Sequence, residues 1–216
     1  MTLFWPKCAP ALAGLVAGLT AGQLASSAPA FQVVGTNSPF GAPSLIWGIS
    51  GDGNYLTGYT TVAATRRAYR QQVAGVGEIV ETFPNGSESV AFAATEAGSV
   101  VVGEAKIDGF WHGFRWEEGI GAIDLGLFPG SGSFTRAADV TADGRTVVGF
   151  AQGDDGQHAF FWTAEEGLRR LSGIPQDIVF SWAEGVTDGP SGLTIVGRSR
   201  NSNGDVEGFR WRDGEF

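Results

Sequence analysis

Two histidines are the side chains of this 216-residue chain best suited to acid–base or metal chemistry. His112 and His158 occupy the same place in two similar segments, His112-Gly113-Phe114 and His158-Ala159-Phe160. A catalytic site needs partners that converge at one point, which a repeated position does not supply. A hydrogen-bonding role at a strand edge is therefore favoured over a role as base or ligand. The sequence also lacks a nucleophile elbow, a phosphate loop and a dinucleotide fingerprint, so we predict no catalytic residue and no cofactor.

Aspartates beside glycines form the second group with possible chemistry. Asp143-Gly144 lies between β-branched runs, where this pair is typical of a hairpin turn. Asp154-Asp155-Gly156 and the stretch from Asn201 to Asp205 resemble the start of a calcium loop, but no bidentate carboxylate follows at the proper distance. We therefore predict no metal site.

The six tryptophans of residues 31–216 fall into two sets. Three recur at one position of a repeat and are predicted to pack between repeats: Trp116, Trp162 and Trp211. Three do not recur, and we predict that they bind a sugar or a protein: Trp47, Trp111 and Trp182. Two charged residues, Arg136 and Glu184, are predicted to form the polar rim of this site. Trp47 is placed on an inner strand, where the other units have Val90, Ala137 and Glu184. Ordinary core filling is the alternative for these tryptophans.

The repeat that positions these side chains is marked by four glycines, Gly58, Gly103, Gly149 and Gly197, spaced 45, 46 and 48 residues apart. An aromatic residue follows each glycine after 11 or 12 residues. Short runs of β-branched and aromatic residues between turns predict four antiparallel strands per unit, the size of a propeller blade. Small residues mark the first strand of each unit as the innermost. We predict an all-β fold, a small β-propeller of about four four-stranded blades.

The two ends of the repeat region are complementary. Residues 31–216 number 186, or 46.5 for each of four units, and the last unit lacks its outer strand. Phe31 to Gly35 resembles that missing strand and is predicted to close the propeller beside Phe209 to Trp211, which would hide two open edges. A truncated piece of a longer array is the alternative.

Residues 1–30 have the composition of a secretory signal. They contain no acidic residue, one lysine at Lys7 and an apolar run from Ala9 to about Leu24, followed by Ala28-Pro29-Ala30. We predict cleavage after Ala30 and a mature domain of residues 31–216; an uncleaved anchor is the rival, but the run is short and interrupted by glycines. Cys8 would leave with the signal, so no disulfide is expected. We predict a protein that is secreted, periplasmic or at the cell surface, without a membrane span after cleavage.

These motifs resemble a bacterial extracellular repeat family named for its His-Ala-Phe motif. His158-Ala159-Phe160-Phe161-Trp162 matches in full, with Asp143-Gly144 and Val147-Val148-Gly149 before it, and His112-Gly113-Phe114-Arg115-Trp116 is a near match. The first and fourth units lack the histidine. The resemblance covers nearly all of residues 31–216 and implies secretion and a repeat fold, but it implies no activity.

Together these features favour a secreted binding or scaffold module without enzymatic activity, whose partner is a surface polysaccharide or an envelope protein. The net charge of -9 argues against nucleic acid. A hydrolase or lyase at the propeller axis is a second hypothesis, for which Asp139 and Glu184 are the candidate residues. A purely structural spacer is the third.

Overall fold

The computed structural model describes residues 44–84, 88–130, 132–190 and 192–212, and these residues form strands and turns only. Among them there is no helix with the length and apolarity of a membrane span. The predicted signal (1–30) and the predicted closing strand (31–35) lie outside the described residues, so both stay predictions.

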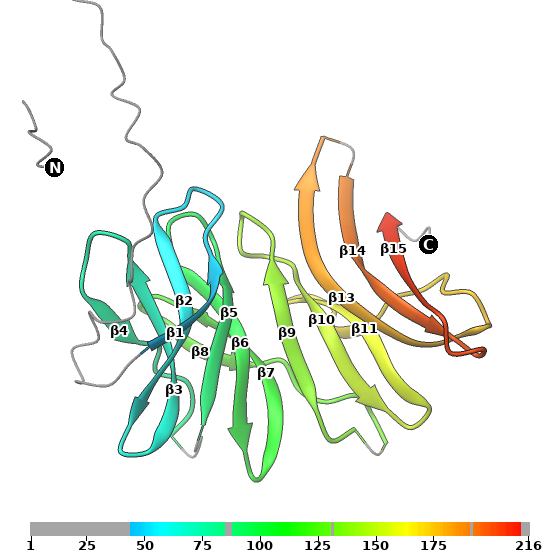
Figure 1. Ribbon diagram of the computed structural model, residues 1–216, viewed down its shortest axis with the longest axis horizontal. Coiled ribbons are helices and arrows are strands. Elements are labelled where there is room, and N and C mark those ends of the chain that lie inside the picture. The colour runs from blue at the N-terminus through cyan, green and yellow to red at the C-terminus, as the bar shows by residue number, and fades with distance from the viewer. Residues whose placement is uncertain (1–43, 85–87, 131, 191, 213–216) are drawn as a thin grey trace, which may run out of the picture. The chain divides into compact units, whose positions relative to one another are not determined.

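Four antiparallel sheets follow one another along the chain (Figure 1). The first contains β1 (Ser44–Ile49), β2 (Tyr55–Val62), β3 (Thr65–Gln72) and β4 (Gly77–Ile79). The second contains β5 (Ser89–Ala94), β6 (Val100–Ile107), β7 (Phe110–Glu117) and β8 (Gly121–Asp124). The third contains β9 (Thr135–Val140), β10 (Val147–Gly153), β11 (Gly156–Thr163) and β12 (Gly167–Arg170). The fourth contains β13 (Ile178–Gly189), β14 (Gly192–Asn201) and β15 (Val206–Arg212).

Each sheet is a meander in which strands pair in chain order, and each packs against the next sheet along the chain. The fourth sheet has three described strands, in agreement with the sequence. The strand nearest the axis is the first of each unit, because β1, β5, β9 and β13 pack on one another in turn. The predicted small propeller of about four blades is confirmed.

The repeated glycines are explained by a repeated β-bulge in the first strand. The bulge residues are Trp47, Phe92, Ala138 and Glu184. Each bulge turns a first-strand carbonyl onto the Cα of the glycine opposite, as Arg136 does at Gly149. A side chain there would overlap that carbonyl, so only glycine fits. The bulge also corrects the predicted register, because Phe92 and Ala138, not Val90 and Ala137, are the equivalents of Trp47.

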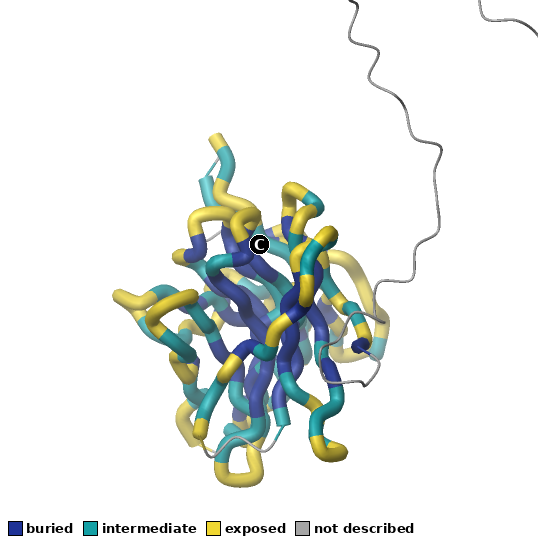
Figure 2. The backbone as a smooth tube through the Cα atoms, turned by 90° about the vertical axis from the view of Figure 1, so that its left-hand side faces the viewer, coloured by how far each residue is buried: buried dark blue, intermediate teal, exposed yellow. Residues whose placement is uncertain are grey.

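The core lies between the sheets rather than within one layer. Three apolar clusters fill the three interfaces between consecutive sheets, and Figure 2 shows the buried backbone in the interior with exposed residues at the turns. Trp162 and Trp211 are buried in two of these clusters, and Trp116 packs against the third. The predicted packing role of the repeated tryptophans is confirmed.

Candidate ligand-binding face

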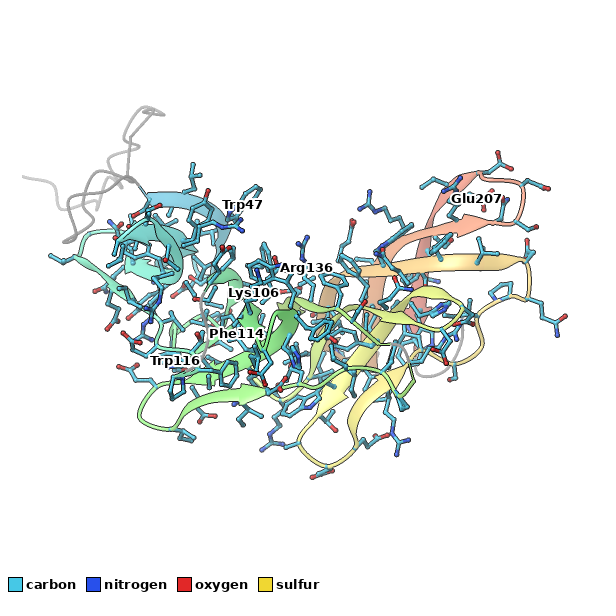
Figure 3. The ribbon with its side chains drawn as sticks, turned by 90° about the horizontal axis from the view of Figure 1, so that it is seen from below. Trp47, Lys106, Phe114, Trp116, Arg136 and Glu207 are labelled. Atoms are coloured by element: carbon cyan, nitrogen blue, oxygen red, sulfur yellow. The ribbon has the colours of Figure 1, made fainter. Side chains whose placement is uncertain are left out.

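Aromatic and arginine side chains from all four sheets gather on one face of the molecule. They lie on, or directly before, the first, second or third strands of the sheets. Together with one glutamate we call them the aromatic–arginine band: Arg66, Phe92, Trp111, Phe134, Arg136, Phe150, Phe180, Trp182, Glu184 and Arg198. Figure 3 shows Trp47 and Arg136 on one side and Trp116 on the other.

Arg136 lies at the centre of the band. Its guanidinium donates from Nε and Nη2 to both carboxylate oxygens of Glu104, at 2.7 and 3.0 Å. It also lies over three rings, with 4.9 Å to the centroid of Phe92 and slightly longer distances to Phe134 and Phe150. Because Glu104 is buried on β6 and Arg136 is on β9, this bidentate pair joins the second and third sheets.

Trp182 on β13 is held on several sides. Its indole N–H donates to Gln157 at 2.7 Å, and its ring stacks on Phe180 at 6.0 Å between centroids. Phe150 approaches it edge-on at 6.5 Å, which connects Trp182 to Arg136 through a shared ring. Such aromatic pairs fix ring orientation, so the half-buried Trp182 ring is held in one position.

Glu184 and Arg198 continue the band in the fourth sheet. Arg198 lies over the Trp182 ring at 5.0 Å and pairs with Glu184 at 3.0 Å. Both charged side chains are more than half exposed, so this pair contributes little to stability and its members remain accessible to a ligand.

Trp111 on β7 begins the band at the other end. It forms a bridge with Phe134, and Arg66 lies over its ring at 5.5 Å. Trp47, with 63% of its surface exposed, shares the face of Arg136, but none of the described contacts joins it to the band. The structure thus brings four of the five predicted residues into one chain of contacts and leaves Trp47 beside it.

Sequence reasoning missed Arg66, Phe150 and Arg198. A signal was available for the last two, since each follows a repeated glycine, in Gly149-Phe150 and Gly197-Arg198. At this position every unit differs, and the side chain lies directly opposite a first-strand residue, as Arg198 lies opposite Trp182. The glycine is the same in every unit, but the residue after it differs. The fold of the repeat therefore does not depend on that second side chain, which is free to contact a ligand.

A separate pocket lies where the four inner strands converge. Its volume is about 250 Å³, and residues of all four sheets line it, among them Ile49, Thr95, Asp139 and Val186. Asp139 accepts a hydrogen bond from the Val186 N–H at 2.8 Å, and burial raises the pKa of its carboxyl. Glu184 does not line this pocket, so the two carboxylates proposed for an axial active site do not converge.

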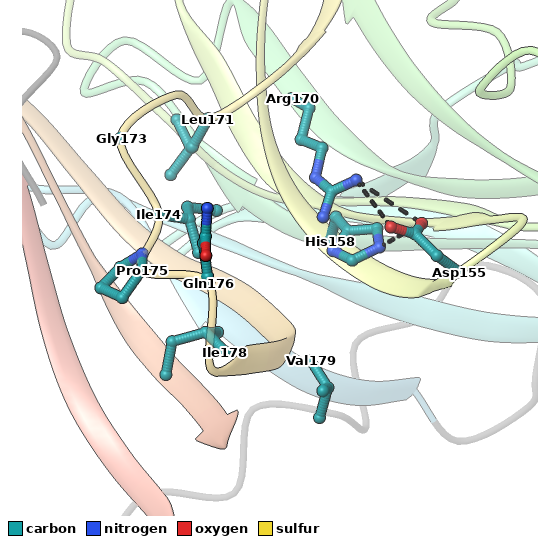
Figure 4. Close-up of a pocket in the computed structure, with 10 residues that line it drawn as sticks. All are labelled: Asp155, His158, Arg170, Leu171, Gly173, Ile174, Pro175, Gln176, Ile178 and Val179. Carbon is teal, nitrogen blue, oxygen red and sulfur yellow. Dashed lines mark hydrogen bonds and ion pairs between the residues drawn. The ribbon is translucent and has the colours of Figure 1, made fainter. Parts of the chain in front are cut away.

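The two histidines bond to carboxylates of their own sheets. His112 contacts Asp124 at 3.0 Å through Nδ1, and His158 contacts Asp155 at 2.7 Å through Nε2. Arg170 holds the other oxygen of Asp155 at 3.1 Å, and the three side chains form one wall of a pocket of about 440 Å³ (Figure 4). Burial lowers the pKa of His158, which favours the neutral form of the ring. These contacts agree with the hydrogen-bonding role favoured by the sequence.

Hydrogen bonds from within the same loop stabilise the loops at Asp143 and Asn201. Asp143 accepts hydrogen bonds from the Thr141 hydroxyl and the Arg145 N–H at 2.7 and 3.0 Å, as expected in a hairpin turn. Asn201 accepts in the same way from the N–H groups of Asn203 and Asp205. Across the described ranges, no group of three or more metal-binding side chains is assembled.

Fold and face define a propeller-type repeat protein. No family model matches the sequence, and no curated protein matches it. Among solved structures, the putative TolB from Agrobacterium tumefaciens is similar in fold, with a TM-score of 0.56 and 16% identity over 82% of this chain and 69% of that one. TolB from Acinetobacter baumannii aligns at 0.47 and 14% identity over 78% of this chain. The chain spans 43% of the length of the A. baumannii protein.

Proposed function

We propose that this protein is a non-enzymatic binding module that recognises a surface polysaccharide through the aromatic–arginine band and Trp47. The observation that carries this proposal is the contrast between repeated and unrepeated side chains. Repeated aromatics such as Phe114, Phe160 and Trp162 are buried between sheets, whereas unrepeated ones gather on one face. Trp47 is exposed and has no described contact, so packing does not account for it, while Trp111 and Trp182 lie half-buried on the same face as Arg136.

The chemistry of the band suits a sugar ligand. Indole rings stack on the apolar faces of pyranose rings, and arginines donate hydrogen bonds in a plane to hydroxyl or carboxylate oxygens. Trp47 is exposed, and Trp111 and Trp182 are half-buried. An envelope protein is the other partner class that such a face suits, since tryptophan and arginine dominate protein interfaces. The predicted signal and the resemblance to the His-Ala-Phe repeat family support a location outside the cytoplasm, which we include in the proposal.

The proposal is tested by applying the purified protein to an array of bacterial surface polysaccharides. Trp47→Ala, Trp111→Ala and Trp182→Ala should each reduce binding by about tenfold or more, while Ile120→Ala, an exposed residue on the turn before β8, should not. Retention of full binding by all three tryptophan variants would remove the band as the site.

The axial pocket favours a second candidate, a hydrolase or lyase. Asp139 is the sole acid among its register equivalents, which are Gly48, Ala93 and Gly185, and a carboxyl with a raised pKa can act as a general acid. This hypothesis predicts release of new reducing ends from the same polysaccharides and loss of that release in Asp139→Asn. Binding without release would reject it for those substrates.

A further inference from the structure

Two kinds of contact recur at the interfaces between consecutive sheets, each at two of the three interfaces. We call the side of a sheet that faces the next sheet its back and the opposite side its front. At the back of the first sheet, the Ala68 N–H donates to the Ser89 hydroxyl of the second sheet at 2.9 Å. The third sheet repeats this contact, since the Ala159 N–H donates to Ser181 of the fourth at 2.9 Å.

A second repeated contact uses an arginine on the third strand. Arg70 donates to the Gly98 carbonyl oxygen, in the hairpin turn of the next sheet, at 2.5 Å. Arg115 does the same to Gly144 at 2.8 Å. The back of a sheet can thus supply a backbone donor, an arginine and an apolar second strand. The front of the next sheet supplies a hydroxyl and a turn carbonyl oxygen.

The back of the fourth sheet has these groups but no partner sheet among the described residues. Val196 is 46% exposed, whereas Val102 and Val148, its equivalents, are fully buried. Gly208 is exposed where Ala68 and Ala159 are buried. Arg210 pairs with Val196 as Arg70 pairs with Thr57, so the two arginines are equivalent. Arg210 is exposed, whereas Arg70 is buried.

The front of the first sheet has the matching half. Ile49 is 61% exposed, whereas its equivalents Ala94 and Val140 are buried against the preceding sheet. A Cβ at Gly53, in the hairpin turn, would meet no atom within 4 Å, although the equivalent Gly98 lies against Tyr55 of the sheet before it. Ser44, the equivalent of Ser89, is buried, and among the described residues no group of another sheet bonds to its hydroxyl.

We propose that the back of the fourth sheet binds the front of the first sheet of a second copy of this chain. In this contact Arg210 donates to the Gly53 carbonyl oxygen, and Val196 packs on Ile49. Val102 is the equivalent of Val196, and Val140 is the equivalent of Ile49. Val102 and Val140 lie in one cluster between the second and third sheets, so we expect Val196 and Ile49 to meet in the same way.

Such a contact is head-to-tail, and head-to-tail contacts either close into rings or continue as filaments. Two copies joined at both ends form a ring of eight sheets, within the range of known propellers. Burial of both faces also removes exposed apolar surface, which is the driving force for the association.

Sedimentation equilibrium of the purified protein at micromolar concentration tests this proposal, and a dimer is expected. Val196→Asp and Ile49→Lys should each raise the dimer Kd by about tenfold or more, and mixing the two variants should restore dimers because one interface then pairs opposite charges. Ile120→Asp, in a sheet covered on both sides, is the matched control and should leave the wild-type dimer unchanged.

Folding of each variant is checked by circular dichroism, and if one variant does not fold, the other still tests the interface. A monomeric wild-type protein would overturn the proposal, and this is also the result that closure within one chain predicts. Dimers of unchanged affinity in a folded Val196→Asp or Ile49→Lys variant would overturn it too. Because this readout is the mass of the protein, it is independent of polysaccharide binding.

Discussion

The close approach of strands at the repeated glycines predicts a large effect of a small substitution. In Gly149→Ala the new Cβ would overlap the carbonyl oxygen of Arg136 and lie 2.9 Å from its carbonyl carbon. Since non-bonded carbons prefer about 3.5–4.0 Å, the β9 strand would have to retreat by roughly 1 Å. That movement lengthens ladder hydrogen bonds, each worth about 1 kcal/mol, and overpacking adds about 1–3 kcal/mol.

We therefore expect Gly149→Ala to lower the free energy of unfolding by about 2–4 kcal/mol. Urea denaturation followed by tryptophan fluorescence measures this loss. Gly189→Ala is the matched control, because a Cβ there would meet no atom within 4 Å, and it should change the stability by less than about 0.5 kcal/mol. Equal stability losses in the two variants would refute the bulge as the reason for the repeated glycine.

Three further predictions concern charged residues. Arg136→Ala leaves Glu104 buried without its partner and should cost about 2–3 kcal/mol in a urea titration, whereas Arg145→Ala, 85% exposed in its side chain, should cost almost nothing; equal losses would contradict the role of the buried pair. Hydrogen bonds lower the pKa of Asp143, so its contribution to the free energy of unfolding is present above the ordinary carboxyl pKa of about 4 and is lost as pH falls. Asp143→Asn should therefore reduce the dependence of the free energy of unfolding on pH in the acid range. An unchanged dependence on pH would contradict this expectation. Burial raises the pKa of Asp139, so ionisation of this carboxyl lowers the free energy of unfolding as pH rises. Asp139→Asn should therefore be more stable than wild type at pH 7 and equally stable near pH 3. A variant less stable than wild type at pH 7 would contradict this expectation.

Much of the fold follows from local pattern. The spacing of Gly58, Gly103 and Gly149 predicted the units, because strand length and turn chemistry repeat with the residues that encode them. The hairpin at Asp143-Gly144 and the buried Trp162 followed from the same register. Such features depend on neighbours in sequence or on an identical contact made in every unit.

Contacts made once could not be predicted in this way. The strand pairing aligns Trp47 with the bulge residue Phe92, two residues after Val90. The arginines that cover Trp111 and Trp182 come from other strands, and their places depend on how strands pair and sheets pack.

The sequence alone determined the repeat, the strand order within a unit and which tryptophans are shared, since these depend on periodicity. Only the tertiary structure decided that Arg136, Trp182 and Glu184 form one band while Asp139 turns to the axis. The physical reason is that alternate side chains of a strand point to opposite faces, and a single bulge decides which residues reach which face.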